Sequence, residues 1–267
     1  MTSSPTTIVL ITGANQGIGY AVAEQLLKQN GYYILLGSRN AENGAKAAAE
    51  LDPSGQLVEP ITIDVTDDAS IQLAADHIAS KHGRIDVLIN NAGINNELSL
   101  HWKQQENKEE NKKRKPDLPA LRQIYRDAYE VNLFGAAITT EAFIPLLEKA
   151  TSKPARIVFV SSHTGSIGLR VDQSSSFYEK MSRPSFPIYR SSKTAMNMLT
   201  LHYAAQFQEQ GWKVNASCPN LTKSAFSRFS DLGRSPAESA VNIVRLATLS
   251  EDGETGRYSD ENGAVDW

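Results

Sequence analysis

The sequence predicts an α/β protein with a doubly wound parallel sheet of about seven strands and helices on both faces. Short apolar runs of strand length alternate with longer amphipathic runs of helix length over nearly all of the 267 residues. Most of the short runs are apolar throughout, which is typical of parallel strands buried on both faces. Because crossovers between parallel strands are right-handed, we expect the helices to cover both faces of the sheet.

The expected elements follow one another in regular order. The strand-like runs occupy residues 7–12, 32–37, 57–63, 84–90, 155–160 and 213–217. Helical patterns lie between or after them, at residues 17–29, 41–51, 68–82, 121–149 and 188–210. The C-terminal part, "SPAESAVNIVRLATLS" followed by "GRYSDENGAVDW", predicts one more helix and a short final strand. There is no repeat and no linker, so we expect a single domain over residues 1–267.

Two segments interrupt this pattern. Residues 101–119 are charged, end at a proline and have almost no apolar face, so we expect a solvated insertion that is partly helical or disordered. Residues 165–187 are rich in serine, glycine and proline and predict a long loop with room for a helical turn. Its bulky side chains could cover an apolar substrate or simply pack the loop on its own domain. These side chains are Leu169, Phe177, Tyr178, Met181 and Phe186.

Composition argues against several classes of partner. The net charge of −3 gives no basic surface for nucleic acid and no cationic face for a membrane. The single cysteine, Cys218, excludes an internal disulfide and a cysteine-rich metal site, and the histidines show no ligand spacing, so we expect no metal. The start of the chain lacks the pattern of a secretory signal, and no apolar run approaches the ~20 residues that span a bilayer. We therefore expect a cytoplasmic protein.

A glycine-rich turn, "TGANQGIG" at residues 12–19, joins the first strand to the first helix. Gly13, Gly17 and Gly19 allow a tight turn, a close approach of backbone to a pyrophosphate, and packing of the helix on the sheet. The helix N-terminus adds unpaired N–H groups and a positive dipole end. This context predicts that the turn binds a dinucleotide.

The end of the second strand, "LLGSRN", bears on which dinucleotide binds. Ser38 stands where an acidic residue would hold the ribose 2′-hydroxyl of NAD, and Arg39 follows it. A planar guanidinium suits a 2′-phosphate. The alternative is a surface arginine without a partner. We favour NADP(H).

Tyr189 and Lys193 lie four residues apart in the helical pattern, so their side chains share one face. Taken alone, this pair could be a packed tyrosine beside a lysine that reaches solvent along its apolar stem.

Further motifs occur in a fixed order along the chain. They are "DV" at 64–65, "NNAG" at 90–93, "VN" at 131–132, "VSS" at 160–162 and "YRSSK" at 189–193. With the glycine-rich turn they resemble the short-chain dehydrogenase/reductase family over nearly the whole chain. The stretches "GANQGIG", "GSRN" and "LATLSEDGETG" look most similar to its carbonyl-reductase-like members.

The resemblance implies a Rossmann fold and an NADPH-dependent reductase that converts a ketone, aldehyde or quinone to an alcohol. Tyr189 would donate the proton to the carbonyl oxygen. Lys193 would favour the phenolate of Tyr189 and hold the nicotinamide ribose. Ser162 would hydrogen-bond the carbonyl oxygen, and Asn132 would anchor a water that links Lys193 to solvent.

The resemblance also implies a set of cofactor contacts. Asp64 would face the adenine amino group, Asn15 and Arg39 the 2′-phosphate, and Ile18 the pyrophosphate. The expected cofactor-binding residues are Gly13, Asn15, Gly17, Ile18, Gly19, Ser38, Arg39, Asp64, Val65, Asn91, Ala92, Gly93, Tyr189, Lys193, Pro219 and Thr222.

The chain departs from the family pattern in three places. Asn220 stands at a position that is usually glycine, and asparagine tolerates left-handed backbone better than most residues. The step from Ser162 to Tyr189 is longer than usual, so the loop between them could roof the substrate site or cover an oligomer interface. The insertion near 101–119 adjoins a helix that many members use for dimers, so a homo-oligomer is possible but the insertions favour a monomer.

Two alternatives stay open: a non-catalytic dinucleotide-binding protein, and an enzyme of altered chemistry such as an isomerase or cyclase.

Overall fold

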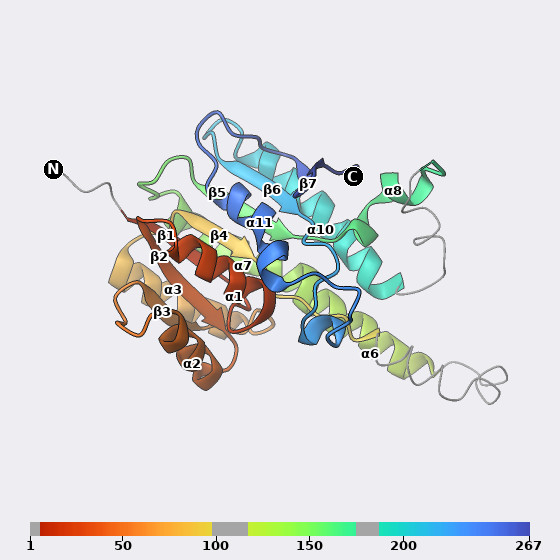
Figure 1. The fold of residues 1–267 in the computed structure, drawn as a ribbon, viewed down its shortest axis with the longest axis horizontal. Coiled ribbons are helices and arrows are strands. Elements are labelled where there is room, and N and C mark those ends of the chain that lie inside the picture. Colours follow the sequence, from red (N-terminus) through yellow and green to blue (C-terminus); the bar gives the residue numbers. More distant parts are fainter. Residues whose placement is uncertain (1–5, 98–116, 175–186) are drawn as a thin grey trace.

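Seven parallel strands and a short antiparallel eighth form one sheet, in the order β3-β2-β1-β4-β5-β6-β7-β8, in the computed structural model of the chain (Figure 1). The structure describes residues 6–97, 117–174 and 187–267. The strands are β1 (Thr7–Ile11), β2 (Tyr32–Ser38), β3 (Val58–Thr62), β4 (Val87–Asn90), β5 (Arg156–Val160), β6 (Lys213–Ser217), β7 (Tyr258–Asp260) and β8 (Gly263–Ala264). The α-helices are α1 (Gly17–Leu27), α2 (Ala41–Leu51), α3 (Asp68–His82), α6 (Leu118–Tyr129), α7 (Gly135–Leu147), α8 (Ile167–Val171), α10 (Pro187–Gln206) and α11 (Pro236–Ala247).

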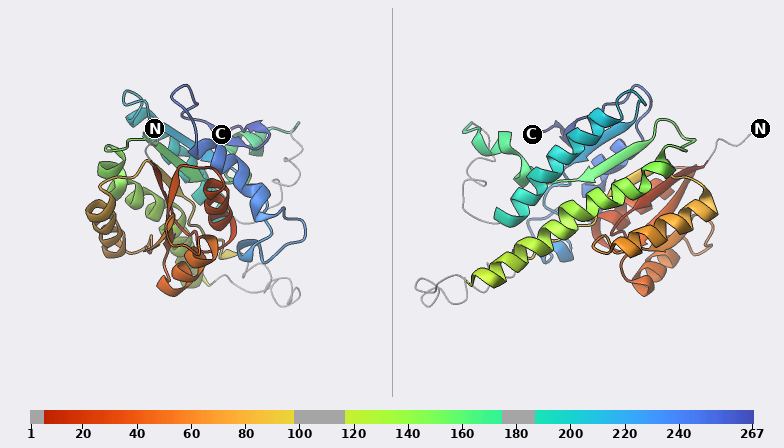
Figure 2. Two further views of the ribbon diagram at one scale, coloured as in Figure 1. Left: turned by 60° about the vertical axis from the view of Figure 1, so that its left-hand side comes forward. Right: turned by 180° about the vertical axis from the view of Figure 1, so that it is seen from behind.

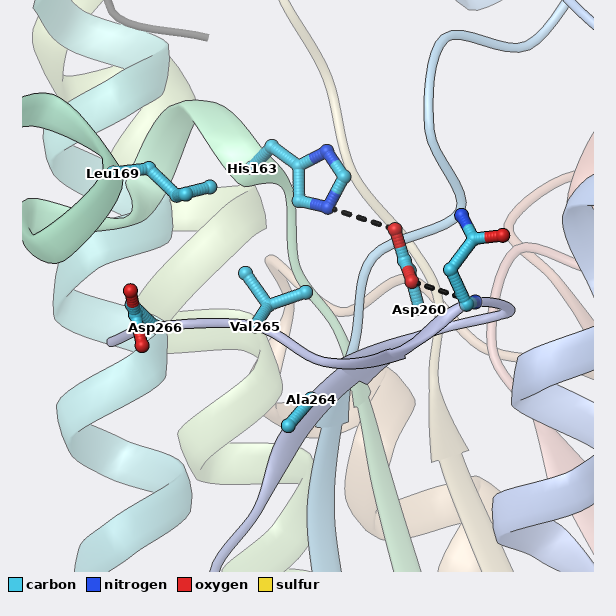
Figure 3. Close-up of a pocket in the computed structure, with 7 residues that line it drawn as sticks. His163, Leu169, Asp260, Ala264, Val265 and Asp266 are labelled. Carbon is cyan, nitrogen blue, oxygen red and sulfur yellow. Dashed lines mark hydrogen bonds and ion pairs between the residues drawn. The ribbon is translucent and has the colours of Figure 1, made fainter. Parts of the chain in front are cut away.

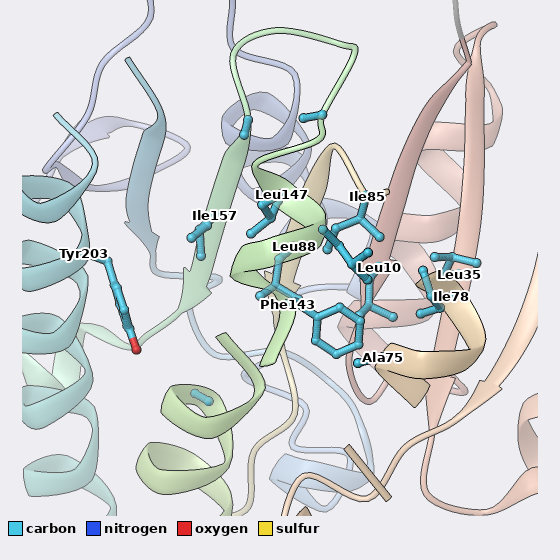
Figure 4. Close-up of a cluster of buried hydrophobic side chains, with 14 of the residues drawn as sticks. Leu10, Leu35, Ala75, Ile78, Ile85, Leu88, Phe143, Leu147, Ile157 and Tyr203 are labelled. Atoms are coloured by element: carbon cyan, nitrogen blue, oxygen red, sulfur yellow. The ribbon is translucent and has the colours of Figure 1, made fainter. Parts of the chain in front are cut away.

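The central strands β1, β4 and β5 bury both of their faces, which explains their continuous apolar runs. Along β1, Ile8 and Leu10 belong to one hydrophobic cluster and Val9 and Ile11 to another, because successive side chains point to opposite faces. The first cluster lies under α3, α7 and α10, and the second under α1, α2 and α11. Figure 4 shows Phe143 of α7 among strand and α3 side chains in the first cluster. The predicted doubly wound α/β fold is confirmed.

The strand order reverses between β1 and β4, since the chain runs outward from β1 through β2 to β3 and then returns to β4 on the other side. In open parallel sheets, ligands bind outside the carboxyl ends of the strands at such a reversal. The glycine-rich turn follows β1 and the "NNAG" stretch ends β4, so both lie at this edge.

A continuous helical segment runs from Leu118 to Leu147 (Figure 2). Asp117 caps its start through the Ala120 N–H, and five residues of π-helix, Glu130–Phe134, join α6 to α7. By length and composition this segment could cross a membrane. The sequence had predicted no apolar run long enough to do so, and this finding differs from that prediction. Core helices pass the same test, and α7 packs against β4 and α3. The α7 half of the segment therefore has the position of a core helix, whereas Ala128 is the only residue of α6 that is buried.

The two interrupting segments are only partly described. Of the charged insertion, residues 101–116 lie outside the described residues. The predicted loop begins with a short 3₁₀ turn, His163–Gly165, and then the helix α8, which is the expected helical turn. Phe177, Tyr178, Met181 and Phe186 lie outside the described residues. The predicted final strand is β7, and the pairing of β8 with it was not expected.

Candidate active site

The glycine-rich turn leaves room for a phosphate group. Gly13 and Gly17 have φ of 63° and 61°, a region that side chains rarely adopt. A Cβ on Gly19 would lie 2.6 Å from the Asn91 side chain and 2.8 Å from the Gly13 carbonyl oxygen, so only glycine fits there. The residue before α1, Gln16, makes no side-chain hydrogen bond to the helix. The first N–H groups of α1 thus keep the open end that anions favour.

The stretch after β4 is fixed against this turn. The Thr12 hydroxyl accepts hydrogen bonds from the backbone N–H groups of Asn91 and Ala92, both at 3.0 Å. The Asn91 amide donates to the carbonyl oxygens of Thr12 and Gly13 at 2.8 and 3.0 Å. These bonds occupy the Asn91 amide N–H groups, so this side chain braces the turn.

The end of β2 presents an exposed cation. Ser38 is buried and donates to the Asn40 carbonyl oxygen at 2.9 Å, whereas Arg39 is exposed. Among the described residues, Arg39 has no hydrogen bond or ion pair. Asp64 is held at the adjacent strand end by the N–H and hydroxyl of Thr66, at 3.0 and 2.8 Å. Asn15 and Ile18 are partly exposed beside the turn. The glycine cradle and the exposed arginine thus lie at the same edge of the sheet, where residues that could hold a dinucleotide are expected.

Two of the expected catalytic residues, Asn132 and Lys193, meet at Gly93, and Tyr189 lies beside Lys193. Tyr189 and Lys193 stand on α10, with the Lys193 Nζ 5.8 Å from the centre of the Tyr189 ring. A Cβ on Gly93 would lie 3.4 Å from the Asn132 Oδ1 and 3.6 Å from the Lys193 Nζ. Asn132 lies in the π-helical turn, a feature common at functional sites. The loop that follows "NNA" thus joins the dinucleotide turn to the catalytic group.

Hydrogen bonds fix two of these side chains. The buried Asn132 exchanges two bonds with the Ile94 backbone, at 2.8 and 3.0 Å, and its amide donates to the Ser192 hydroxyl at 3.1 Å. The Lys193 ammonium is 3% exposed and donates to the Val160 carbonyl oxygen at 2.8 Å. These bonds hold both side chains in this orientation.

Ser162 follows β5 and begins the 3₁₀ turn. Its hydroxyl accepts from the Thr164 N–H at 3.3 Å and lies 3.0 Å from the Thr164 hydroxyl. It also shares a hydrogen bond with the Tyr189 side chain. A carbonyl oxygen placed between Ser162 and Tyr189 would therefore meet two hydroxyl groups.

Burial governs the charges at this site. Burial raises the pKa of Tyr189 above its usual value, although the hydrogen bond with Ser162 lowers it. Burial lowers the pKa of Lys193 to about 8. The expected lowering of the Tyr189 pKa by Lys193 is thus not the dominant effect here, because the low-polarity surroundings disfavour both charged forms.

The turn after β6 adopts the backbone expected of its asparagine. Asn220 has φ of 61°, and its amide donates to the two Glu261 carboxylate oxygens at 2.9 and 3.2 Å. Pro219 is buried. Thr222 is also buried, and its hydroxyl is paired with the Ser239 hydroxyl at 2.7 Å, so it supports the turn and offers no free hydroxyl. The same loop then passes the glycine-rich turn, with the Ser224 Cβ 3.8 Å from a Cβ on Gly17.

Two neighbouring groups were not anticipated from the sequence. The Phe226 ring packs edge-on against the Tyr189 ring, with centroids 5.5 Å apart. His163 pairs with Asp260 at 3.1 Å, in a cavity of about 280 Å³ between α8 and the C-terminal segment (Figure 3). Neither contact has a local signal, since each joins distant segments. Within the described ranges, no three His, Cys, Asp or Glu side chains are arranged to hold a metal ion.

Comparison with known proteins agrees with this geometry. The family model described as short chain dehydrogenase matches residues 7–233. A short-chain dehydrogenase of Penicillium roqueforti, anuI, is 35% identical over 97% of this chain and 96% of its own. NADPH-bound carbonyl reductase from chicken fatty liver superposes with a TM-score of 0.77 at 25% identity, covering 98% of this chain and 100% of its own. A 3-ketoacyl-(acyl-carrier-protein) reductase from Brucella melitensis, complexed with NADH, has a TM-score of 0.75 at 20% identity over 97% and 98% of the two chains, which shows the fold alone.

Proposed function

The chain belongs to the short-chain dehydrogenase/reductase family, and on that premise we propose that it reduces a ketone, aldehyde or quinone to an alcohol with NADPH. Family membership makes it an oxidoreductase that binds a nicotinamide dinucleotide. The observation that carries the proposal is that Asn132 and Lys193 meet at Gly93, in the loop that packs on the glycine-rich turn, with Tyr189 beside Lys193.

The residues divide the chemistry among them. A nicotinamide dinucleotide supplies the hydride to the carbonyl carbon in such a reaction. Tyr189 gives its hydroxyl proton to the carbonyl oxygen, and Ser162 donates a hydrogen bond to the same oxygen as negative charge develops on it. Because burial raises the pKa of Tyr189, the free phenol is a weak acid, and its proton transfer depends on stabilisation of the phenolate. Lys193 stabilises the phenolate left behind, and Asn132 fixes the helix segment that faces it.

The preference for NADPH rests on the end of β2. Ser38 leaves no carboxylate there to repel a 2′-phosphate, and Arg39 is an exposed guanidinium whose charge no described acidic group neutralises. The chicken carbonyl reductase carries NADPH, whereas the more distant Brucella reductase carries NADH. The remaining expected contacts, from Asn15 and Ile18 to Asp64 and Val65, belong to the same proposal.

We further propose a single cytoplasmic domain without nucleic-acid or membrane partners. The insertions near 101–119 and 165–187 favour a monomer over a homo-oligomer, which size-exclusion chromatography with light scattering would measure.

The proposal is tested with purified protein, both reduced dinucleotides and a panel of small and polycyclic carbonyl compounds. We expect at least one carbonyl to be reduced, with NADPH preferred over NADH. Binding of dinucleotide without turnover on any carbonyl would favour the non-catalytic alternative, and turnover without net oxidation of NADPH would favour an isomerase or cyclase.

A further inference from the structure

A buried carboxylate lies at the N-terminus of the helix that carries Tyr189. Glu97 is 7% exposed, and its Oε2 accepts a hydrogen bond from the Tyr189 backbone N–H at 2.7 Å. Tyr189 is the third residue of α10, so this N–H is one of those that a helix leaves without an internal partner. The carboxylate acts as a cap supplied from a segment 92 residues away.

The segment that carries Glu97 is itself firmly attached. The Ile94 backbone exchanges two hydrogen bonds with the Asn132 amide, and the Asn96 amide donates to the Ile124 carbonyl oxygen of α6 at 3.2 Å. The loop after β4 is therefore tied to the π-helical turn and to α6 before it reaches α10. A rigid support is needed if a cap is to fix the position of a helix end.

The backbone N–H and carbonyl group of Tyr189 are both connected by hydrogen bonds to the loop after β4 or to Asn132. Glu97 holds the N–H, while the Ser192 hydroxyl donates to the Tyr189 carbonyl oxygen at 2.8 Å and receives the Asn132 amide at 3.1 Å. Negative charge at a helix N-terminus is favoured by the helix dipole, so the charged form of Glu97 suits this place. The side chain that must donate the proton is thus aligned through its own main chain.

We propose that Glu97 is a positioning residue for the reaction, which holds the first turn of α10 so that the Tyr189 hydroxyl meets the substrate carbonyl. The inference rests on the proposed function and adds a residue outside the motifs. Displacement of a catalytic group by about 1 Å costs on the order of 100-fold in rate. Loss of the cap should therefore reduce kcat while leaving dinucleotide affinity intact, because Glu97 does not line the glycine-rich turn.

A set of matched variants tests the proposal. In Glu97→Ala we expect kcat to fall about 10-fold or more, with the NADPH dissociation constant within about twofold of wild type. Glu97→Gln keeps an acceptor oxygen and should restore kcat to within about threefold. The guanidinium of Arg190 interacts electrostatically with Glu97, so Arg190→Gln is the control for loss of that charge pair. Its kcat should stay within about threefold of wild type.

Glu59→Gln is the control variant for a general loss of stability. It removes another buried carboxylate, on β3, that contacts His77, Lys81 and His82. This variant should lose stability but keep the wild-type kcat. If Glu97→Ala keeps kcat within about twofold, or if Arg190→Gln reproduces its loss, the proposal is wrong.

Amide hydrogen exchange at Tyr189, followed by NMR, tests the same anchor without turnover. We expect exchange of this N–H to accelerate about 10-fold or more in Glu97→Ala and to stay near wild type in Glu97→Gln. A wild type without turnover on any carbonyl would overturn the proposed function, whereas unchanged Tyr189 exchange in Glu97→Ala would overturn the role of Glu97.

Discussion

Replacing Lys193 with methionine should abolish turnover and yet stabilise the protein at neutral pH. Lys193 is 3% exposed, and burial lowers its pKa from 10.5 to about 8. Holding such a group charged at pH 7 costs roughly 3 kcal/mol of folding free energy. Its removal also leaves the Val160 carbonyl oxygen without the 2.8 Å bond, at a cost of ~1–3 kcal/mol. Lys193→Met should therefore be more stable than wild type by about 1 kcal/mol at pH 7.

The pH dependence separates this cause from better packing. Between pH 8 and 10.5 the unfolded state binds the Lys193 proton more tightly than the folded state, so wild-type stability rises with pH in that window. At pH 10 the cost of burying the lysine falls below about 1 kcal/mol, and the variant should then be the less stable protein. Urea denaturation of both proteins at pH 7 and pH 10 measures the difference. A difference that is the same at both pH values would refute the reasoning.

Three further perturbations probe separate parts of the account. Arg39→Asp should weaken NADPH binding several-fold to about 100-fold and spare NADH, as isothermal titration of both dinucleotides would show; a wild type that prefers NADH would contradict it. Gly19→Ala would place a Cβ 2.6 Å from the Asn91 side chain, so dinucleotide affinity and thermal stability should both fall, and a variant that binds normally would exclude the close packing of this turn. Burial alone would raise the pKa of Glu59, but hydrogen bonds from His77 and its neighbours lower it to about 2. Glu59→Gln should therefore cost ~1.5–3 kcal/mol at pH 7, and this difference from wild type should shrink as the pH falls from 4.5 towards 2; a difference independent of pH would contradict it.

The sequence predicted most of the fold because its central strands β1, β4 and β5 are buried on both faces. Continuous apolar runs and glycine positions are local signals, and they predicted the strands and the turn between β1 and α1 that the structure contains. The left-handed backbone at Asn220 was also anticipated from the residue type. In contrast, the antiparallel β8 is only two residues long and leaves no periodic pattern.

The contacts that the sequence did not reveal join distant segments. Glu97 caps a helix through the N–H of Tyr189, which lies 92 residues later, and no spacing rule connects the two. The packing of Phe226 on Tyr189 likewise depends on how the loop after β6 folds back. Burial, too, depends on contacts between distant segments. The lowering of the pKa of Lys193 could not be predicted without knowing which residues cover it. Residue types and order thus predicted the candidate reacting groups, while the tertiary structure was needed to find the groups that contact them.

The central claim is that Tyr189 donates the proton, and Tyr189→Phe tests it most directly because only the hydroxyl is lost. The measurements are the rate of reduction of a carbonyl compound that the wild type reduces and the NADPH dissociation constant. Tyr33→Phe is the control, because it removes a hydroxyl that is hydrogen-bonded to Glu59 on β3. We expect kcat of Tyr189→Phe to fall by at least ~100-fold with NADPH binding retained, and the control to match wild type. Near-normal turnover by Tyr189→Phe would contradict the account.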